Sequence, residues 1–164
     1  MKRTIALITV VFLLTSLFGC KQTGSVREPK EPVNFYYCNR ADEHSHTEAL
    51  ISPELREALG HTNDHEYLLS LYLNGPLSYQ YVSPFPRGVA LHAFSFDNGV
   101  ADITLSNQIT QLTDFDATLA FACLTLTVKD LTGADSITIR AKDGLINDSA
   151  SITLSPDLFA YPVT

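Results

Sequence analysis

Apolar residues recur along the chain in two patterns, one typical of strands and the other typical of helices. Runs rich in aromatic and β-branched residues predict strands over residues 33–38, 136–140 and 151–154. The clearest element is a hairpin, in which residues 89–96 and 100–105 flank Asp97-Asn98-Gly99. Asn-Gly favours the positive φ angles of a tight turn. Alternation in the second arm predicts that one face is buried, with Ala101, Ile103 and Leu105 pointing inward.

A first helix is predicted to begin after Asn63. The side chain of Asn63 is expected to cap this helix, and Glu66 completes a capping box. The helix then runs to Leu73, where Asn74-Gly75-Pro76 ends it, because glycine accepts the closing left-handed conformation and proline cannot continue a helix.

A second helix is predicted over residues 114–131. Thr113 and Asp116 have the spacing of a capping box, and Gly133 is suited to close the helix. The alternation in Leu124-Thr125-Leu126-Thr127-Val128 also fits a strand, but the caps at both ends favour a helix. Because this helix is apolar on most sides, we expect it to be largely buried.

Two segments show neither the strand pattern nor the helix pattern of apolar residues. In residues 48–60 we expect a short extended piece followed by a helical turn around Glu54 to Leu59, and residues 77–88 are expected to form a surface loop. The order of the elements predicts an α+β fold: a single small domain with two helices on one face of a mixed or antiparallel sheet.

The first 20 residues have the layout of a lipoprotein signal. Lys2 and Arg3 precede the apolar run from Ile5 to Leu14, and Leu17-Phe18-Gly19-Cys20 is similar to a bacterial lipobox. We expect residues 1–19 to be removed as a signal peptide and Cys20 to receive diacylglycerol, which leaves residues 20–32 as a tether and residues 33–164 as the domain. The alternative is an ordinary cleaved signal with a coincidental cysteine. Lipidation predicts a protein anchored to the extracytoplasmic face of the cell membrane.

The charge balance excludes two classes of partner. The chain has 11 Lys and Arg against 18 Asp and Glu, and removal of Lys2 and Arg3 leaves nine basic residues and a net charge of −9. Such an acidic surface repels phosphate backbones and anionic headgroups, so we expect no nucleic-acid partner and no basic membrane-binding patch.

Two cysteines remain after Cys20. Cys38 and Cys123 both lie in apolar stretches, which favours two buried thiols, although a single disulfide is the alternative in an exported protein.

Histidines and carboxylates are the candidates for site chemistry. His44, His46, His61 and His65 lie near acidic residues, a combination that suits zinc, but we expect solvated loop histidines and no metal site.

The carboxylates of Asp114 and Asp116 fit the first turn of a helix without any catalytic role. The sequence contains no nucleophile elbow, P-loop or dinucleotide fingerprint. We therefore expect a non-enzyme without a cofactor.

The loop with Tyr79, Tyr81 and Phe85 is the candidate interaction surface. Tyrosines between prolines are typical of a contact surface for a protein or a sugar ring. The alternative is that they pack under the sheet as part of the core.

Several landmarks, in this order, resemble the GerMN domain of sporulation and spore-germination proteins. An aromatic strand at residues 33–37 is followed by a helix ending in Asn74-Gly75-Pro76, a loop with Pro86 and Gly88, a hairpin with Asp97 and Gly99, and a strand leading into Asp143-Gly144. The resemblance implies an extracytoplasmic membrane-associated protein, in many cases a lipoprotein, with no catalytic residues. It also implies a fold similar to ring-building motifs, which act by subunit contact. The protein that typifies the family has two such domains in tandem, and this chain has room for one.

Together these features predict a lipid-anchored, non-catalytic interaction module that docks a cell-envelope protein through a sheet edge or the tyrosine-rich loop. The alternative is a lipoprotein that binds a small ligand, a glycan or a metal through the histidine-rich segments.

Overall fold

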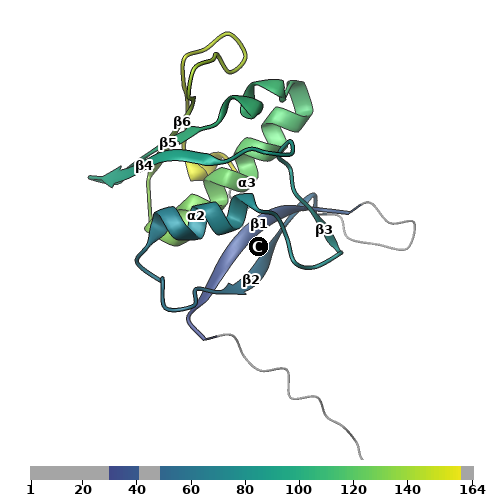
Figure 1. The fold of residues 1–164 in the computed structure, drawn as a ribbon, viewed down its shortest axis with the longest axis vertical. Coiled ribbons are helices and arrows are strands. Elements are labelled where there is room, and N and C mark those ends of the chain that lie inside the picture. Colours follow the sequence, from purple (N-terminus) through teal and green to yellow (C-terminus); the bar gives the residue numbers. More distant parts are fainter. Residues whose placement is uncertain (1–29, 41–48, 160–164) are drawn as a thin grey trace, which may run out of the picture.

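The computed structural model describes residues 30–40 and 49–159. The strands form two sheets, with orders β2-β1-β3 and β4-β5-β6-β7. The helices are α2 (His65–Leu73) and α3 (Asp114–Thr132), and two short 3-10 helices, η1 (Asn107–Gln111) and η2 (Pro156–Leu158), complete the described elements. This arrangement confirms the α+β class and the single small domain, and it divides the strands between two sheets rather than one (Figure 1).

The first sheet is organised around β1 (Pro32–Asn39). β2 (Ile51–Glu57) pairs antiparallel with β1 along its length, and the short β3 (Tyr81–Val82) pairs with its C-terminal end. The predicted helical turn around Glu54 to Leu59 is therefore wrong, because pairing with β1 makes residues 51–57 extended. Pro53 fits there because β2 is an edge strand, where one row of N–H groups has no partner strand.

The second sheet contains the predicted hairpin. β4 (Leu91–Asp97) and β5 (Val100–Leu105) pair antiparallel, and Asn98 and Gly99 have φ angles of +48° and +79°. The residues predicted to point inward from β5 are fully buried. β6 (Ser136–Ala141) pairs parallel with β5 after a crossover through α3, and β7 (Ile152–Leu154) pairs antiparallel with β6.

Both helices lie close to their predicted ranges. α2 is capped by Asp64, whose carboxylate accepts a hydrogen bond from Tyr67 N at 3.1 Å, so the predicted cap at Asn63 is wrong by one residue. Thr113 is the N-cap of α3, but its side chain makes no capping hydrogen bond. Gly133 closes α3 at φ +75°, and most of the middle of the helix is buried, as predicted.

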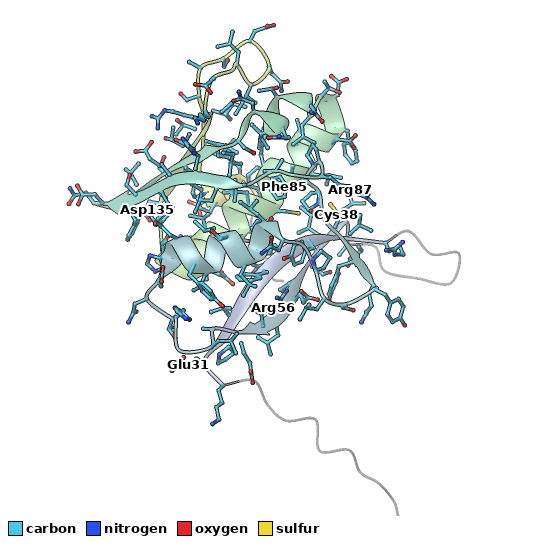
Figure 2. The ribbon with its side chains drawn as sticks, viewed as in Figure 1. Glu31, Cys38, Arg56, Phe85, Arg87 and Asp135 are labelled. Carbon is cyan, nitrogen blue, oxygen red and sulfur yellow. The ribbon has the colours of Figure 1, made fainter. Side chains whose placement is uncertain are left out.

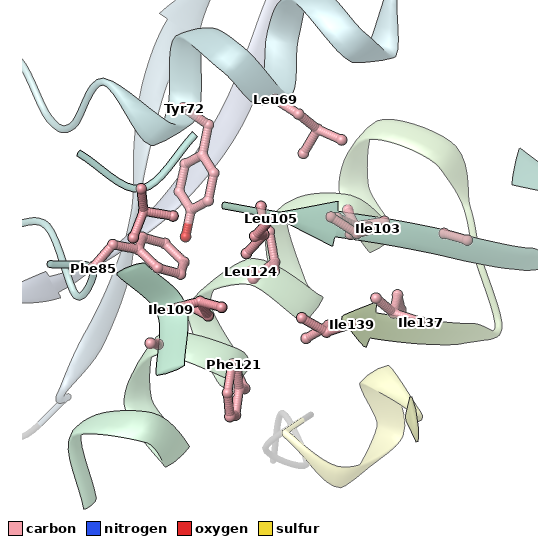
Figure 3. Close-up of a cluster of buried hydrophobic side chains, with 14 of the residues drawn as sticks. Leu69, Tyr72, Phe85, Ile103, Leu105, Ile109, Phe121, Leu124, Ile137 and Ile139 are labelled. Atoms are coloured by element: carbon pink, nitrogen blue, oxygen red, sulfur yellow. The ribbon is translucent and has the colours of Figure 1, made fainter. Parts of the chain in front are cut away.

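The core joins the two sheets through α2. The ring of Tyr72 stacks on Tyr37 of β1 and meets Phe35 edge-on, while His65 at the other end of the helix packs against Phe94 of β4. In Figure 1, α2 accordingly runs between β4 and the β1-β2 pair. Figure 3 shows Tyr72 and Phe85 on one side of a cluster that continues through Leu124 and Ile139.

Polar contacts hold the start and the middle of β1 in place. At its start, the carboxylate of Glu31 accepts hydrogen bonds from Gly60 N at 3.1 Å and Thr62 Oγ1 at 3.0 Å, and Glu31 is labelled at this end in Figure 2. Further along, Tyr36 N donates to Thr127 Oγ1 of α3 at 2.9 Å. Burial, together with the nearby carboxylate of Asp130, raises the pKa of Tyr36 to about 12.

The turn of the hairpin provides a test of this fold. Replacing Asn98-Gly99 with Val-Val puts β-branched residues at positive φ, and a Cβ at Gly99 meets Asp135 Oδ2 at 2.8 Å. We expect a loss of about 3 kcal/mol in the free energy of unfolding, measured by urea denaturation. The control Asn98→Gly retains the turn and changes this free energy by less than about 1 kcal/mol. An unchanged urea midpoint in the Val-Val variant contradicts the hairpin.

Candidate functional site

Residues 77–82, called here the tyrosine loop, connect α2 to the first sheet. Their backbone is held by Glu54 of β2, whose carboxylate accepts hydrogen bonds from Leu77 N at 3.0 Å and Ser78 N at 2.7 Å. Glu54 is only 7% exposed. Its charge is balanced by Arg56, whose Nη1 lies 3.0 Å from Glu54 Oε2. A buried carboxylate with several charge-assisted donors makes a strong anchor.

Arg40 holds the other side of the tyrosine loop. Its Nε donates to the carbonyl oxygen of Tyr79 at 2.9 Å, and its backbone N donates to the carbonyl oxygen of Gln80 at 2.8 Å. Both ends of the turn are therefore attached to the first sheet through main-chain atoms. The side chains of Leu77 and Tyr79 take no part in this attachment and are exposed.

The three candidate side chains of this region lie in different environments. Tyr79 is 84% exposed, and Leu77 beside it is 78% exposed. Tyr81 is half-buried, packs against the core and donates its hydroxyl to the carbonyl oxygen of Pro53 at 3.3 Å. Phe85 is 8% exposed and packs edge-on against Tyr72. Both predicted alternatives therefore occur within one segment: Tyr79 lies on the surface and Phe85 in the core.

Sequence reasoning missed the residues that position Tyr79. Glu54, Arg56 and Arg40 are separated from the tyrosine loop by at least 20 positions, and nothing local marks their role. The only available signal was the alternation of Glu54 and Arg56 around Leu55, which places both polar side chains on the same face of an extended segment.

Seven of the residues that carry the GerMN resemblance lie at or next to turns. Asn74, Gly75 and Pro76 end α2, Pro86 and Gly88 precede β4, and Asp97 and Gly99 belong to the β4-β5 hairpin. They direct the chain between elements, and Asn74-Gly75-Pro76 leads directly into the tyrosine loop.

Two of the described histidines, His61 and His65, pack against aromatic rings. His61 stacks on Tyr67 with ring centroids 4.0 Å apart, and its Nδ1 lies 3.5 Å from Asp64 Oδ2. His61 and His65 line one shallow hollow of about 520 Å³. His44 and His46 lie outside the described residues. Within residues 30–40 and 49–159, no three His, Cys, Asp or Glu side chains come together as a metal site.

Another exposed aromatic lies at the start of α3. Phe115 is 60% exposed and lines an apolar groove of about 600 Å³ with Leu50, Leu119 and Leu158. Cys20 lies outside the described residues, and among the helices that are described none is long and apolar enough to cross a membrane.

Comparison with solved structures relates the fold to sporulation proteins. It is similar to the first GerMN domain of the sporulation protein GerM from Bacillus subtilis, with a TM-score of 0.57 and 13% sequence identity, covering 74% of this chain and 92% of that chain. A candidate lipoprotein from Clostridium perfringens gives a TM-score of 0.49 and 16% identity, covering 77% of this chain and 87% of that chain.

Comparison of sequences identifies the family. No curated protein is significantly similar to the chain. The family model for Germane, described as sporulation and spore germination, matches residues 34–144, which include both helices and the strands from β1 to β6. The chain therefore belongs to the Germane family of sporulation and spore germination.

Proposed function

We propose that this protein is a lipid-anchored, non-catalytic interaction module on the extracytoplasmic face of the cell membrane, and that it docks an envelope protein through Tyr79 and Leu77. The observation that carries the proposal is the exposure of these two side chains on a backbone held by the buried Glu54. Family membership supports a role in sporulation or germination.

The geometry of the tyrosine loop favours binding for a physical reason. Ordering a loop and its side chains on association costs free energy, and a loop that is already fixed avoids part of that cost. Tyrosine adds a large apolar face and a hydroxyl that can remain hydrogen-bonded, which explains its enrichment at protein interfaces. Leu77 extends the apolar area on the same turn. The loop therefore combines a fixed backbone with side chains suited to protein contact.

The position of the loop also suits an anchored protein. The chain leads into the domain at Pro32, the start of β1, whereas β3 and the Arg40 contacts lie at the other end of this strand. Residues 21–29, which lie between Cys20 and the start of the described residues, connect the proposed anchor to this end of β1. Lipidation at Cys20 thus places the tyrosine loop on the side of the domain away from the anchor, where an envelope protein has access to it.

The anchor is tested by Cys20→Ser. Without the thiol that accepts diacylglycerol, we expect the protein to be released into the medium or retained as the longer precursor. Fractionation of cells followed by immunoblotting distinguishes these forms. A variant that remains in the membrane fraction with the mobility of the wild-type protein contradicts lipidation at this residue.

The docking side chain is tested by Tyr79→Ala. We expect at least a tenfold loss of partner capture in cells, measured by chemical crosslinking and quantitative mass spectrometry, because exposed aromatic residues at interface centres contribute most to binding. The free energy of unfolding is expected to change by less than about 0.5 kcal/mol. The matched control is Phe115→Ala, which removes an exposed aromatic from another surface. Equal capture by the Tyr79 variant and the wild-type protein contradicts the docking role.

The positioning of the loop is tested by Glu54→Gln. The amide loses the charge-assisted hydrogen bonds to Leu77 N and Ser78 N and leaves Arg56 without its ion-pair partner. We expect a loss of about 2 kcal/mol in the free energy of unfolding, measured in urea, and reduced partner capture. The control Glu66→Gln, at an exposed position of α2, changes this free energy by about 0.5 kcal/mol or less. If both variants are equally stable, Glu54 does not hold the loop.

A further inference from the structure

Cys38 and Cys123 are 85 positions apart in the sequence, yet the packing of β1 against α3 brings their side chains together. On β1, Asn34, Tyr36 and Cys38 share one face because successive strand residues alternate. On α3, Cys123 and Thr127 are one turn apart and share a face of the helix.

Hydrogen bonds fix the register of α3 against β1. Asn34 Nδ2 donates to Asp130 Oδ2 at 3.0 Å, and Tyr36 N donates to Thr127 Oγ1 at 2.9 Å. Two residues along a strand advance about 6.6 Å, and four residues along a helix advance about 6 Å. The next pair after Tyr36 and Thr127 in this register is Cys38 and Cys123.

The two thiols interact directly. A hydrogen bond from the Cys123 thiol lowers the pKa of Cys38 below its usual range. The same hydrogen bond, together with burial, raises the pKa of Cys123 far above its usual range. Cys38 is the less buried of the two thiols, and both cysteines are free in this structure.

The surroundings of the two thiols also differ. Cys38 is half-buried and lines an open groove of about 570 Å³ with Phe85, Gln111 and Leu119. Figure 2 shows Cys38 near Phe85 at the C-terminal end of β1. Cys123 is fully buried. An external reagent therefore reaches Cys38 and does not reach Cys123.

We propose that Cys38 and Cys123 are a modification site at which an extracytoplasmic thiol–disulfide oxidoreductase forms a disulfide linking β1 to α3. The Cys38 thiolate attacks the disulfide of the oxidoreductase, forming a mixed disulfide and releasing one oxidoreductase thiolate, which takes up a proton. Cys123 then loses its proton and attacks Cys38 Sγ, which releases the second oxidoreductase thiol. Two thiols of this protein are oxidised and one oxidoreductase disulfide is reduced to two thiols.

The disulfide links the two elements on which the proposed docking surface depends. β1 follows the tether and leads to Arg40, which holds the tyrosine loop, and α3 spans the core. The proposal rests on the proposed function in one respect, because oxidation in the cell requires export from the reducing cytoplasm.

Free thiols are counted in cells that express the full chain. The cells are quenched with acid, the protein is denatured, and free thiols are labelled with maleimide-linked polyethylene glycol. We expect no adduct without reductant and two adducts after reduction, since the thiol of Cys20 is blocked by lipid. The control Cys38→Ser gives one adduct without reductant, from Cys123. Two adducts on unreduced wild-type protein overturn the disulfide.

Failure of the anchor gives a different result in this experiment. If Cys20 is not lipidated, the wild-type protein carries one more adduct under both conditions, and Cys20→Ser removes it. That result overturns the proposed anchor. The reductant-dependent difference of two adducts still decides whether Cys38 and Cys123 are joined.

The purified lipidated chain tests the pair independently of location. After equilibration with reduced and oxidised glutathione, we expect the oxidised form to melt about 10 °C above the reduced form, because the disulfide closes a long loop of the unfolded chain. The folded Cys123→Ser variant, which retains Cys38, is expected to form a mixed disulfide with glutathione at least tenfold faster than Cys38→Ser. Equal reaction rates of the two variants, or equal melting temperatures of the two redox forms, overturn the proposal.

Discussion

The packing of α3 against β1 determines where the other elements lie. β1 is the middle strand of its sheet, but β3 covers only its last two residues, so Tyr36 would present an unpaired backbone N–H at a sheet edge. The hydroxyl of Thr127 accepts this hydrogen bond from within a buried helix. An unsatisfied backbone N–H is costly in a buried interface. The hydrogen bond from Tyr36 to Thr127 therefore fixes how far α3 lies from β1 and which residues of the two elements face each other.

Other features follow from that register. The opposite face of β1 carries Phe35 and Tyr37, which meet Tyr72 of α2 and so connect the first sheet to the helix that leads into the tyrosine loop. The same register places the two cysteines side by side at the C-terminal end of the strand. The tyrosine loop is then attached to the first sheet by Glu54 and Arg40, so the backbone that carries the exposed Tyr79 is held by β2 and by the residue that follows β1.

Local features were predictable from the sequence, and contacts between distant segments were not. The β4-β5 hairpin and α3 carry their own signals, namely Asn98-Gly99 in the turn and Gly133 at the end of the helix. β2 was predicted only in part because its conformation depends on pairing with β1 rather than on its own composition. Tyr79 could be recognised as a candidate, but the buried carboxylate that holds its loop lies on a strand 25 positions earlier, and no periodicity relates the two.

Site-specific photo-crosslinking, in cells that are growing and in cells that are sporulating, tests whether the tyrosine loop docks an envelope protein. A photoreactive amino acid replaces Tyr79 in one full-length variant and Phe115 in another, and captured proteins are identified by mass spectrometry. We expect position 79 to capture one defined envelope protein that position 115 does not capture. Capture of the same abundant neighbours from both positions, in both conditions, would contradict the assignment of the tyrosine loop as a docking surface.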